Sequence, residues 1–283
     1  MKKFLALLLL LVLIPAPATA ATIIQVTERP HRLIDGTFFD DELATSISQD
    51  GRLWRLVNQA PSGMRMWLVD AALIDDITLM ANGYKLVDGK AGSGKDAAKA
   101  WLANFRNISR YDDVQAMAYG NPSGYWIHRL TPHSESYFLN VSADHLSRFY
   151  GHVVKPLAKY GAYKYFHLTN TQSGAYQNAI AAVQATAKYM DADSSENIHL
   201  RTAALFNESL SNHDRNVLAK DLMAKTREIL YKIRLAPGKF TISSRKQELP
   251  ITVINDFPNP AILKLSIMGM NGRIQTDRKS TRL

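Results

Sequence analysis

The sequence predicts an α/β fold: a (β/α) barrel or barrel-like domain, shaped like the glycosidase and deacetylase barrels, followed by an incomplete all-β sandwich module. Between residues 66 and 203, short apolar runs end at polar residues and are followed by amphipathic stretches. This alternation is typical of parallel strands joined by helices. After Pro237 and Gly238 the period becomes alternating, which indicates antiparallel strands. Cysteine is absent, so the apolar core must stabilise the fold without disulfides.

Residues 1–20 have the pattern of a secretory signal peptide, with two lysines, an apolar run and a final Ala-Thr-Ala. The apolar run is too short to span the ~30 Å hydrocarbon core of a bilayer comfortably, which favours cleavage over an uncleaved anchor. Residues 277–283, DRKSTRL, match a translated sequencing adapter, so we expect an artefact there, a natural protein that continues, and room for a membrane anchor in the missing part. We expect an exported, extracytoplasmic protein associated with the cell envelope.

The net charge of +9 falls to about +5 without these two ends, which is enough only for loose attraction to an anionic envelope surface. Lysine and arginine are scattered, and no nucleic-acid-binding motif is present. The histidines are dispersed and thiolates are absent, so we expect no metal and no cofactor.

The first elements are a strand-like run at 22–26 and a helix over 40–59, capped by Asp40 or Asp41 and divided by Gly51. Later strands are expected at 66–69, 114–118, 136–139, 163–168 and 198–203. Helices are expected at 72–81, 96–109, up to Leu130, from Ser142 toward Tyr160 with a break at Pro156, and at 174–190 and 214–234.

We therefore predict a barrel-like domain over residues 21–236 and a partial β-sandwich module over 237–276. Strands of this module are expected at 240–243, 249–255 and 261–268, with an Asn-Asp-Phe-Pro-Asn-Pro turn between the last two. Three strands are too few to complete a sandwich.

The stretch 89–96, GKAGSGKD, nearly matches a phosphate-binding loop, but Asp96 replaces the magnesium-binding hydroxyl. An exported protein also meets little nucleoside triphosphate, so we interpret the stretch as a glycine loop with Asp96 capping the next helix. The pair Asp40–Asp41 is similar to the paired aspartates of sugar deacetylases, but no His-x-x-x-His follows. We interpret the pair as a solvated helix cap.

Asp70 is the strongest catalytic candidate because it ends an apolar strand, where a barrel places its functional groups. Glycoside hydrolysis needs a second carboxylate, and Glu208 is the one partner expected at an equivalent level. The expected rim of the barrel also carries three candidate ligand-binding residues, Tyr119, Asn140 and His167. Trp126, beside Tyr125, is the tryptophan best placed to stack on a sugar ring. The competing interpretation is that all of these are ordinary polar and packing residues.

Residues 67–106 contain an aspartate followed by apolar pairs, then Met-x-x-Gly-Tyr, Gly-x-Gly and Trp-Leu. Together with the strand at 114–121 and LPITVIND at 249–256, this pattern resembles domain-of-unknown-function family 6049, over residues 33–274. The resemblance implies an exported actinobacterial envelope protein, usually longer and anchored at its C-terminus. Asp70, Gly92 and Gly94 match the family pattern, which assigns them no role.

Two functions are compatible with the sequence. The first is a non-catalytic envelope protein that binds cell-wall glycan or a protein partner. The second is a carbohydrate-active hydrolase, or a deacetylase-like enzyme, acting on cell-wall polysaccharide with Asp70 and Glu208 as acid and base. The hydrolase requires two carboxylates that face each other roughly 5–10 Å apart, whereas the binding protein does not.

Overall fold

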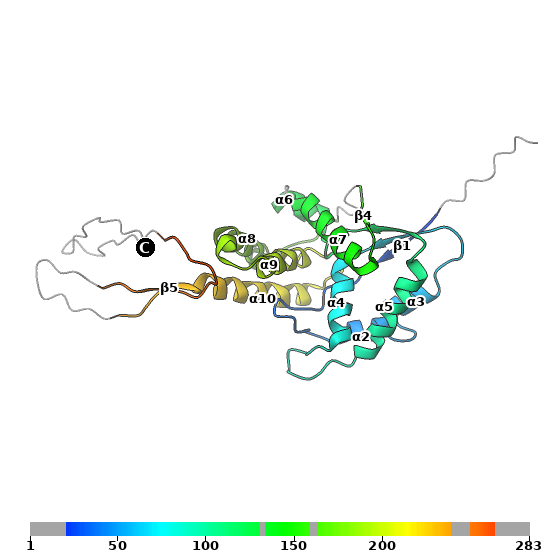
Figure 1. Cartoon of the computed structure of the whole chain (residues 1–283), viewed down its shortest axis with the longest axis horizontal. Coiled ribbons are helices and arrows are strands. Elements are labelled where there is room, and N and C mark those ends of the chain that lie inside the picture. The colour runs from blue at the N-terminus through cyan, green and yellow to red at the C-terminus, as the bar shows by residue number, and fades with distance from the viewer. Residues whose placement is uncertain (1–20, 131–133, 159–163, 239–249, 264–283) are drawn as a thin grey trace, which may run out of the picture. The chain divides into compact units, whose positions relative to one another are not determined.

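The computed structural model describes residues 21–130, 134–158, 164–238 and 250–263, which form a mixed α/β protein (Figure 1). The chain divides into two compact units. The first contains the described residues of 21–31, 38–121 and 134–158, and the second those of 32–37, 122–130, 164–238 and 250–263. The predicted signal peptide and adapter-like tail lie outside the described residues.

The first unit is organised by a parallel sheet of four strands in the order β1-β2-β3-β4. The strands are β1 (Thr22–Val26), β2 (Arg65–Val69), β3 (Asp113–Ala116) and the two-residue β4 (Lys155–Pro156). In register, Ile24 lies opposite Trp67 and Trp67 opposite Val114. The predicted parallel sheet is therefore confirmed, while a closed barrel is not.

Five helices belong to this unit: α2 (Glu42–Ile47), α3 (Arg52–Asn58), α4 (Ala71–Asn82), α5 (Lys95–Ser109) and α7 (Glu135–Tyr150). Helices α2 and α3 confirm the prediction that Gly51 divides the helical stretch over residues 40–59. Helices α4 and α5 lie side by side (Figure 1). The core between sheet and helices includes Trp67, whose ring meets Phe105 of α5 edge to face, with ring centroids 5.5 Å apart. Such aromatic contacts add to the burial of apolar area that stabilises the unit.

Two predicted strands are helices instead, which removes the basis for a barrel. Residues 136–139 lie inside α7, whose buried residues Phe138, Val141 and Leu146 follow the helical period. Residues 198–203 lie inside α9 (Ala192–Ala204). The predicted break at Pro156 is also wrong, because α7 ends at Tyr150, where Gly151 adopts a left-handed φ of 77°.

The second unit is helical, with α6 (Gly124–Leu130), α8 (Asn170–Thr186), the 3-10 turn η3 (Ala187–Tyr189), α9 and α10 (Asn212–Tyr231). Helix α8 packs along α10 and against α9 (Figure 1). Residues 164–168, the described part of a predicted strand, have no regular structure. Ser211 caps α10 as predicted, because its hydroxyl accepts a hydrogen bond from the amide of Asp214 at 3.1 Å.

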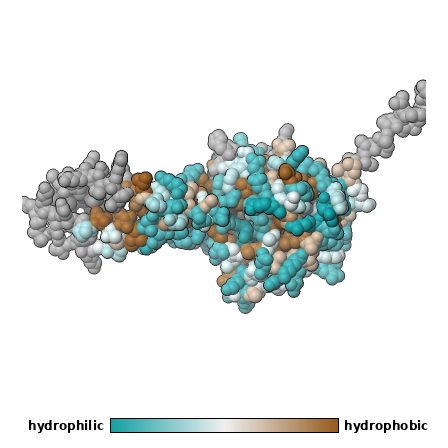
Figure 2. All heavy atoms as spheres, viewed as in Figure 1, coloured by the Kyte–Doolittle hydropathy of each residue, from teal (hydrophilic) through white to brown (hydrophobic). Residues whose placement is uncertain are grey.

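The second unit also carries one antiparallel pair, β5 (Ile233–Leu235) and β6 (Val253–Asn255). The predicted strand 249–255 is thus confirmed in its last three residues. The strand at 240–243 and most of that at 261–268 lie outside the described residues, and no all-β sandwich is seen in the described part. Figure 2 shows apolar side chains gathered near this strand pair, and Leu235 of β5 is exposed. Among the described residues, no helix combines the length and apolarity needed to span a bilayer.

Candidate functional site

Asp70 lies where the sequence predicts it, at the carboxyl end of β2 and directly before α4. Its Oδ1 accepts hydrogen bonds from the amide of Ala72, at 2.9 Å, and from the amide of Gly120, at 2.8 Å. Gly120 belongs to the turn after β3, where its φ of 78° suits glycine. One carboxylate oxygen therefore caps α4 and ties together the turns that follow two neighbouring strands.

The Asp70 side chain is only 1% exposed. Burial raises its pKa to about 7, although the two amide donors act in the opposite direction, and the nearby carboxylates Asp76 and Asp75 add to the rise. A carboxyl group with a pKa near 7 has the acidity of a general acid or base. Its contacts are nevertheless backbone amides that stabilise turns.

A hydrogen-bonded cluster on α4 and α7 adjoins the end of β3. The Oδ2 of Asp75 accepts a hydrogen bond from the Tyr119 hydroxyl at 2.8 Å and lies 2.7 Å from Nδ1 of His145. A carboxylate oxygen accepts, so Nδ1 of His145 donates this hydrogen bond, and Nε2 is the remaining nitrogen of the ring. This Nε2 is buried and has no hydrogen bond to any described residue. Carboxylate, imidazole and phenol form an acid–base cluster.

Of this cluster, the sequence pattern predicts Tyr119 as a site residue but neither Asp75 nor His145. His145 was missed because α7 was divided into a strand and a later helix. The spacing of Asp70 and Asp75 could have indicated Asp75 as a site residue. Asp75 follows Asp70 by slightly more than one turn of a helix that starts at Ala71, which places both near the same end of the helix.

The remaining predicted residues have other surroundings. Asn140 is exposed within α7, so its assignment to a strand end is wrong. Glu208 follows α9 rather than a strand, next to Asn207, which bridges Pro122. Its Oε1 is buried without a hydrogen bond to a described residue. Because Asp70 belongs to the first unit and Glu208 to the second, their pairing stays a prediction.

Trp126 belongs to an aromatic cluster in the second unit, which we define as Tyr125, Trp126, Tyr165 and Phe166. Ring centroids of Tyr125 and Trp126 are 5.2 Å apart, and Trp126 stacks on Tyr165 at 5.9 Å. The Trp126 indole N–H donates to the Phe166 carbonyl at 3.0 Å, which fixes the ring. Tyr165 is 60% exposed, and the neighbouring His167 is exposed as well. The cluster therefore exposes the Tyr165 ring to solvent, while its other three rings are half-buried.

The glycine loop at 89–94 packs around Tyr84. A Cβ on Gly92 would lie 2.0 Å from the Tyr84 ring, and one on Gly94 would lie 2.7 Å from Met80. The Gly94 amide donates to the Tyr84 hydroxyl at 3.0 Å. The glycines are thus required by close packing. The N-cap of α5 is Gly94, so the prediction that Asp96 caps this helix is wrong.

The Asp40–Asp41 pair is held by internal contacts. Asp40 lies 2.6 Å from Nδ1 of His31 and 2.9 Å from Arg29. Burial raises the pKa of Asp40, but hydrogen bonds and charge from His31 outweigh it, and the pKa falls to about 2. Asp41 accepts hydrogen bonds from the Tyr84 and Ser93 hydroxyls. No group of three or more His, Asp or Glu side chains suited to a metal is found in the described ranges.

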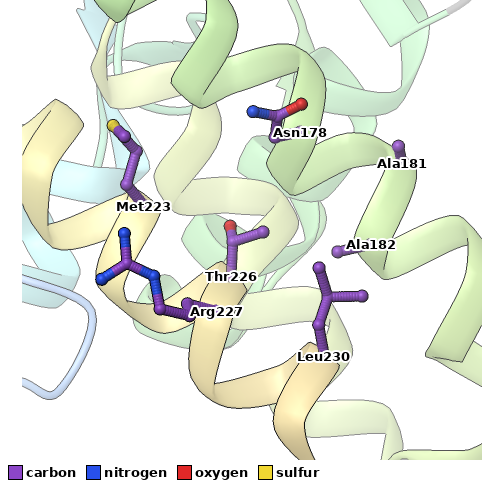
Figure 3. A pocket seen from close by; sticks show the side chains of 7 residues that line it. All are labelled: Asn178, Ala181, Ala182, Met223, Thr226, Arg227 and Leu230. Atoms are coloured by element: carbon purple, nitrogen blue, oxygen red, sulfur yellow. The ribbon is translucent and has the colours of Figure 1, made fainter.

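A groove of about 530 Å³ lies between α8 and α10; the side chains that line it are drawn in Figure 3. It forms because small side chains of α8 face larger ones of α10; the lining residues are Asn178, Ala181, Ala182, Met223, Thr226, Arg227 and Leu230. The groove is largely apolar and offers neither a carboxylate nor an aromatic ring. It therefore fits neither of the sugar-directed functions that the sequence suggests.

No protein-family model matches the chain, and no curated protein matches it. The resemblance to domain-of-unknown-function family 6049 therefore stays a prediction.

Proposed function

We propose that the protein is an exported, non-catalytic glycan-binding protein of the cell envelope, and that the aromatic cluster binds the glycan. The observation that carries this proposal is a group of four aromatic rings that includes the 60% exposed Tyr165. Tyrosine and tryptophan combine an apolar face with a polar edge, which suits the apolar faces and hydroxyl edges of sugars. Export rests on the signal-peptide pattern of residues 1–20.

The surroundings of Asp70 favour a non-catalytic protein. A catalytic carboxylate must reach the substrate, whereas Asp70 is almost fully buried and bonded to the amides of Ala72 and Gly120. Its role is to fix two turns. A protein partner is the other ligand class that an exposed aromatic cluster suits, because tyrosine and tryptophan dominate interface hot spots.

The alternative is a carbohydrate-active hydrolase, or a deacetylase-like enzyme, that uses Asp70 and Glu208. One observation favours it: the pKa of Asp70 is raised to about 7, beside an Asp75–His145 pair. Perturbed carboxyl groups of this kind are common in active sites.

Binding is tested with the full chain and insoluble cell-wall polysaccharide in pull-down assays, followed by calorimetric titration with soluble wall oligosaccharides. Tyr165→Ala should weaken binding about tenfold, because one exposed stacking face is lost. Tyr231→Ala is the matched control, since Tyr231 is an equally exposed tyrosine of the same unit outside the cluster. Equal binding by wild type and Tyr165→Ala would reject the aromatic cluster as the binding surface.

The same polysaccharides separate the two functions when released reducing ends and acetate are measured. The binding protein should release neither and should keep its affinity in Asp70→Asn. Product release that disappears in Asp70→Asn and Glu208→Gln would establish the hydrolase instead.

A further inference from the structure

A cavity of about 430 Å³ lies in the first unit, where α5 ends beside the end of α7. Its lining includes Arg106, Arg110 and Tyr111 from the end of α5 and the following turn, with Tyr150 and His152 from the other side. No carboxylate is among its lining residues. This cationic pocket, as we call it, is separate from Asp70 and from the aromatic cluster.

The two arginines of the cationic pocket are four residues apart, so they project from the same face of α5. Like charges at this spacing repel and destabilise a helix. Within the ranges that the structure describes, neither guanidinium forms an ion pair. The nearby Asp112 is already engaged, accepting from the Trp67 indole at 2.7 Å and pairing with Arg65 at 2.9 Å. Among the residues that the structure describes, no carboxylate pairs with either arginine to offset the repulsion.

Aromatic rings hold both guanidinium groups. The Arg106 guanidinium lies 4.4 Å from the ring centroid of Phe149, and that of Arg110 lies 4.6 Å from Tyr111. A guanidinium stacked by its face keeps its N–H edges available for a ligand. The Tyr150 hydroxyl is bonded to Ser109 at 2.7 Å, and burial raises its pKa, so it stays neutral. The Tyr150 side of the pocket is therefore uncharged.

We propose that the cationic pocket binds a phosphorylated sugar, with Arg106 and Arg110 on the phosphate and Tyr111 against the sugar ring. The planar guanidinium groups of Arg106 and Arg110 can each donate two N–H hydrogen bonds to phosphate oxygens. The exposed His152 adds a further donor. Tyr111 is 86% exposed at the rim, where its free face can cover a ring. The site lies in a different unit from the aromatic cluster and does not depend on the proposed glycan binding.

The test is calorimetric titration of the full chain with four probes: glucose 6-phosphate, inorganic phosphate, glucose and glucuronate. Glucose 6-phosphate should bind best, inorganic phosphate more weakly, and glucose not at all. Added salt should weaken binding, because the contact is ionic. Tighter binding of glucuronate than of glucose 6-phosphate would overturn the assignment to phosphate, and equal affinity for glucose would overturn the role of the arginines.

Variants locate the site. The double variant Arg106→Gln/Arg110→Gln should lose at least about tenfold in affinity for glucose 6-phosphate. Arg148→Gln, an exposed arginine of α7 in the same unit, should bind like wild type. Tyr111→Ala should weaken glucose 6-phosphate and leave inorganic phosphate unchanged. Retained affinity in the double variant would refute the site.

Thermal melting without ligand separates binding from folding. Arg110→Gln should melt close to wild type, because losing the stacking of Arg110 on Tyr111 offsets losing the repulsion between Arg106 and Arg110. Phosphate should raise the melting temperature of wild type and not that of the double variant. The proposal would be refuted, independently of the calorimetry, if the double variant melted at the same temperature as wild type and phosphate still raised that temperature.

Discussion

The two units each bury an ionisable side chain against backbone groups of loops, but with opposite charge. In the first unit Asp70 accepts from the amides of Ala72 and Gly120. In the second unit Arg215, at the start of α10, donates to the carbonyls of Leu205, Asn207 and Leu210. A buried carboxyl group and a buried guanidinium can both supply hydrogen-bond partners to backbone groups of turns that would otherwise be unpaired. The free-energy cost of burying the charge differs between the two groups.

The largest expected effect comes from removing the charge of Asp70. Its carboxyl pKa is 3.8 in the unfolded chain and about 7 in the fold, so the native state binds the extra proton between these values. The stability that this proton contributes is present below pH 3.8 and is lost as pH rises through 7. Asp70→Asn keeps the acceptor for both amides and should be more stable than wild type at pH 8, by up to about 4 kcal/mol.

Urea unfolding of both proteins from pH 4 to pH 8 measures this difference. The two should have similar stability at pH 4 and diverge as pH rises. Groups such as Asp40, whose pKa is lowered to about 2, lose their contribution only in acid and are common to both proteins. A difference that stays constant with pH would mean that Asp70 has an ordinary pKa.

The next effect has the opposite sign. Arg215→Met keeps the side-chain stem but leaves the three carbonyls without their donor, which should lower the free energy of unfolding by about 3 kcal/mol. The effect should be the same at pH 5 and pH 8, because burial lowers the pKa of Arg215 only to about 10. Urea unfolding measures it, and Arg227→Met on the exposed side of α10 is the control. Unchanged stability would show that water replaces the guanidinium.

The smallest effect concerns the start of α8. The Thr169 hydroxyl accepts from the Gln172 amide at 3.2 Å, while the Gln172 side chain accepts from the Thr169 amide at 3.0 Å. Thr169→Ala should destabilise the second unit by about 1 kcal/mol, as expected for loss of a capping box. Thr171→Ala, an exposed position in the first turn of α8, is the control for a thermal melt. A larger loss in the control would contradict the capping role.

How well the sequence predicts structure differs along the chain, for a physical reason. The strand before Asp70 and the helix after it lie together between the turns at Gly63 and Gly83, so both are predicted correctly. The apolar residues at 136–139 and 198–203 belong to longer helices, and a window of four to six residues cannot distinguish the two periods. The cap of α9, in which Asp191 accepts from the Ser194 amide at 2.7 Å, was the missed signal.

The candidate sites were predictable to a similar extent. Asp70 and Trp126 could be named as candidates because the end of an apolar run and an aromatic residue beside a turn are visible in a few neighbouring residues. Asp75–His145 and Arg106–Arg110 were missed, since the first joins residues 70 positions apart and the second depends on which cations lack partners. Contacts of this kind arise from packing and leave little trace in local sequence.

The packing of Gly92 and Gly94 around Tyr84 links three positions that a motif search would treat separately. A smaller residue in place of the tyrosine would open space for a methyl group at Gly92, whereas Gly94 is limited by Met80 and Ala44 as well. Among homologous sequences, the Tyr84 ring and Gly92 should accordingly be kept or exchanged together. Co-variation at these positions would reflect the packing of the Tyr84 side chain.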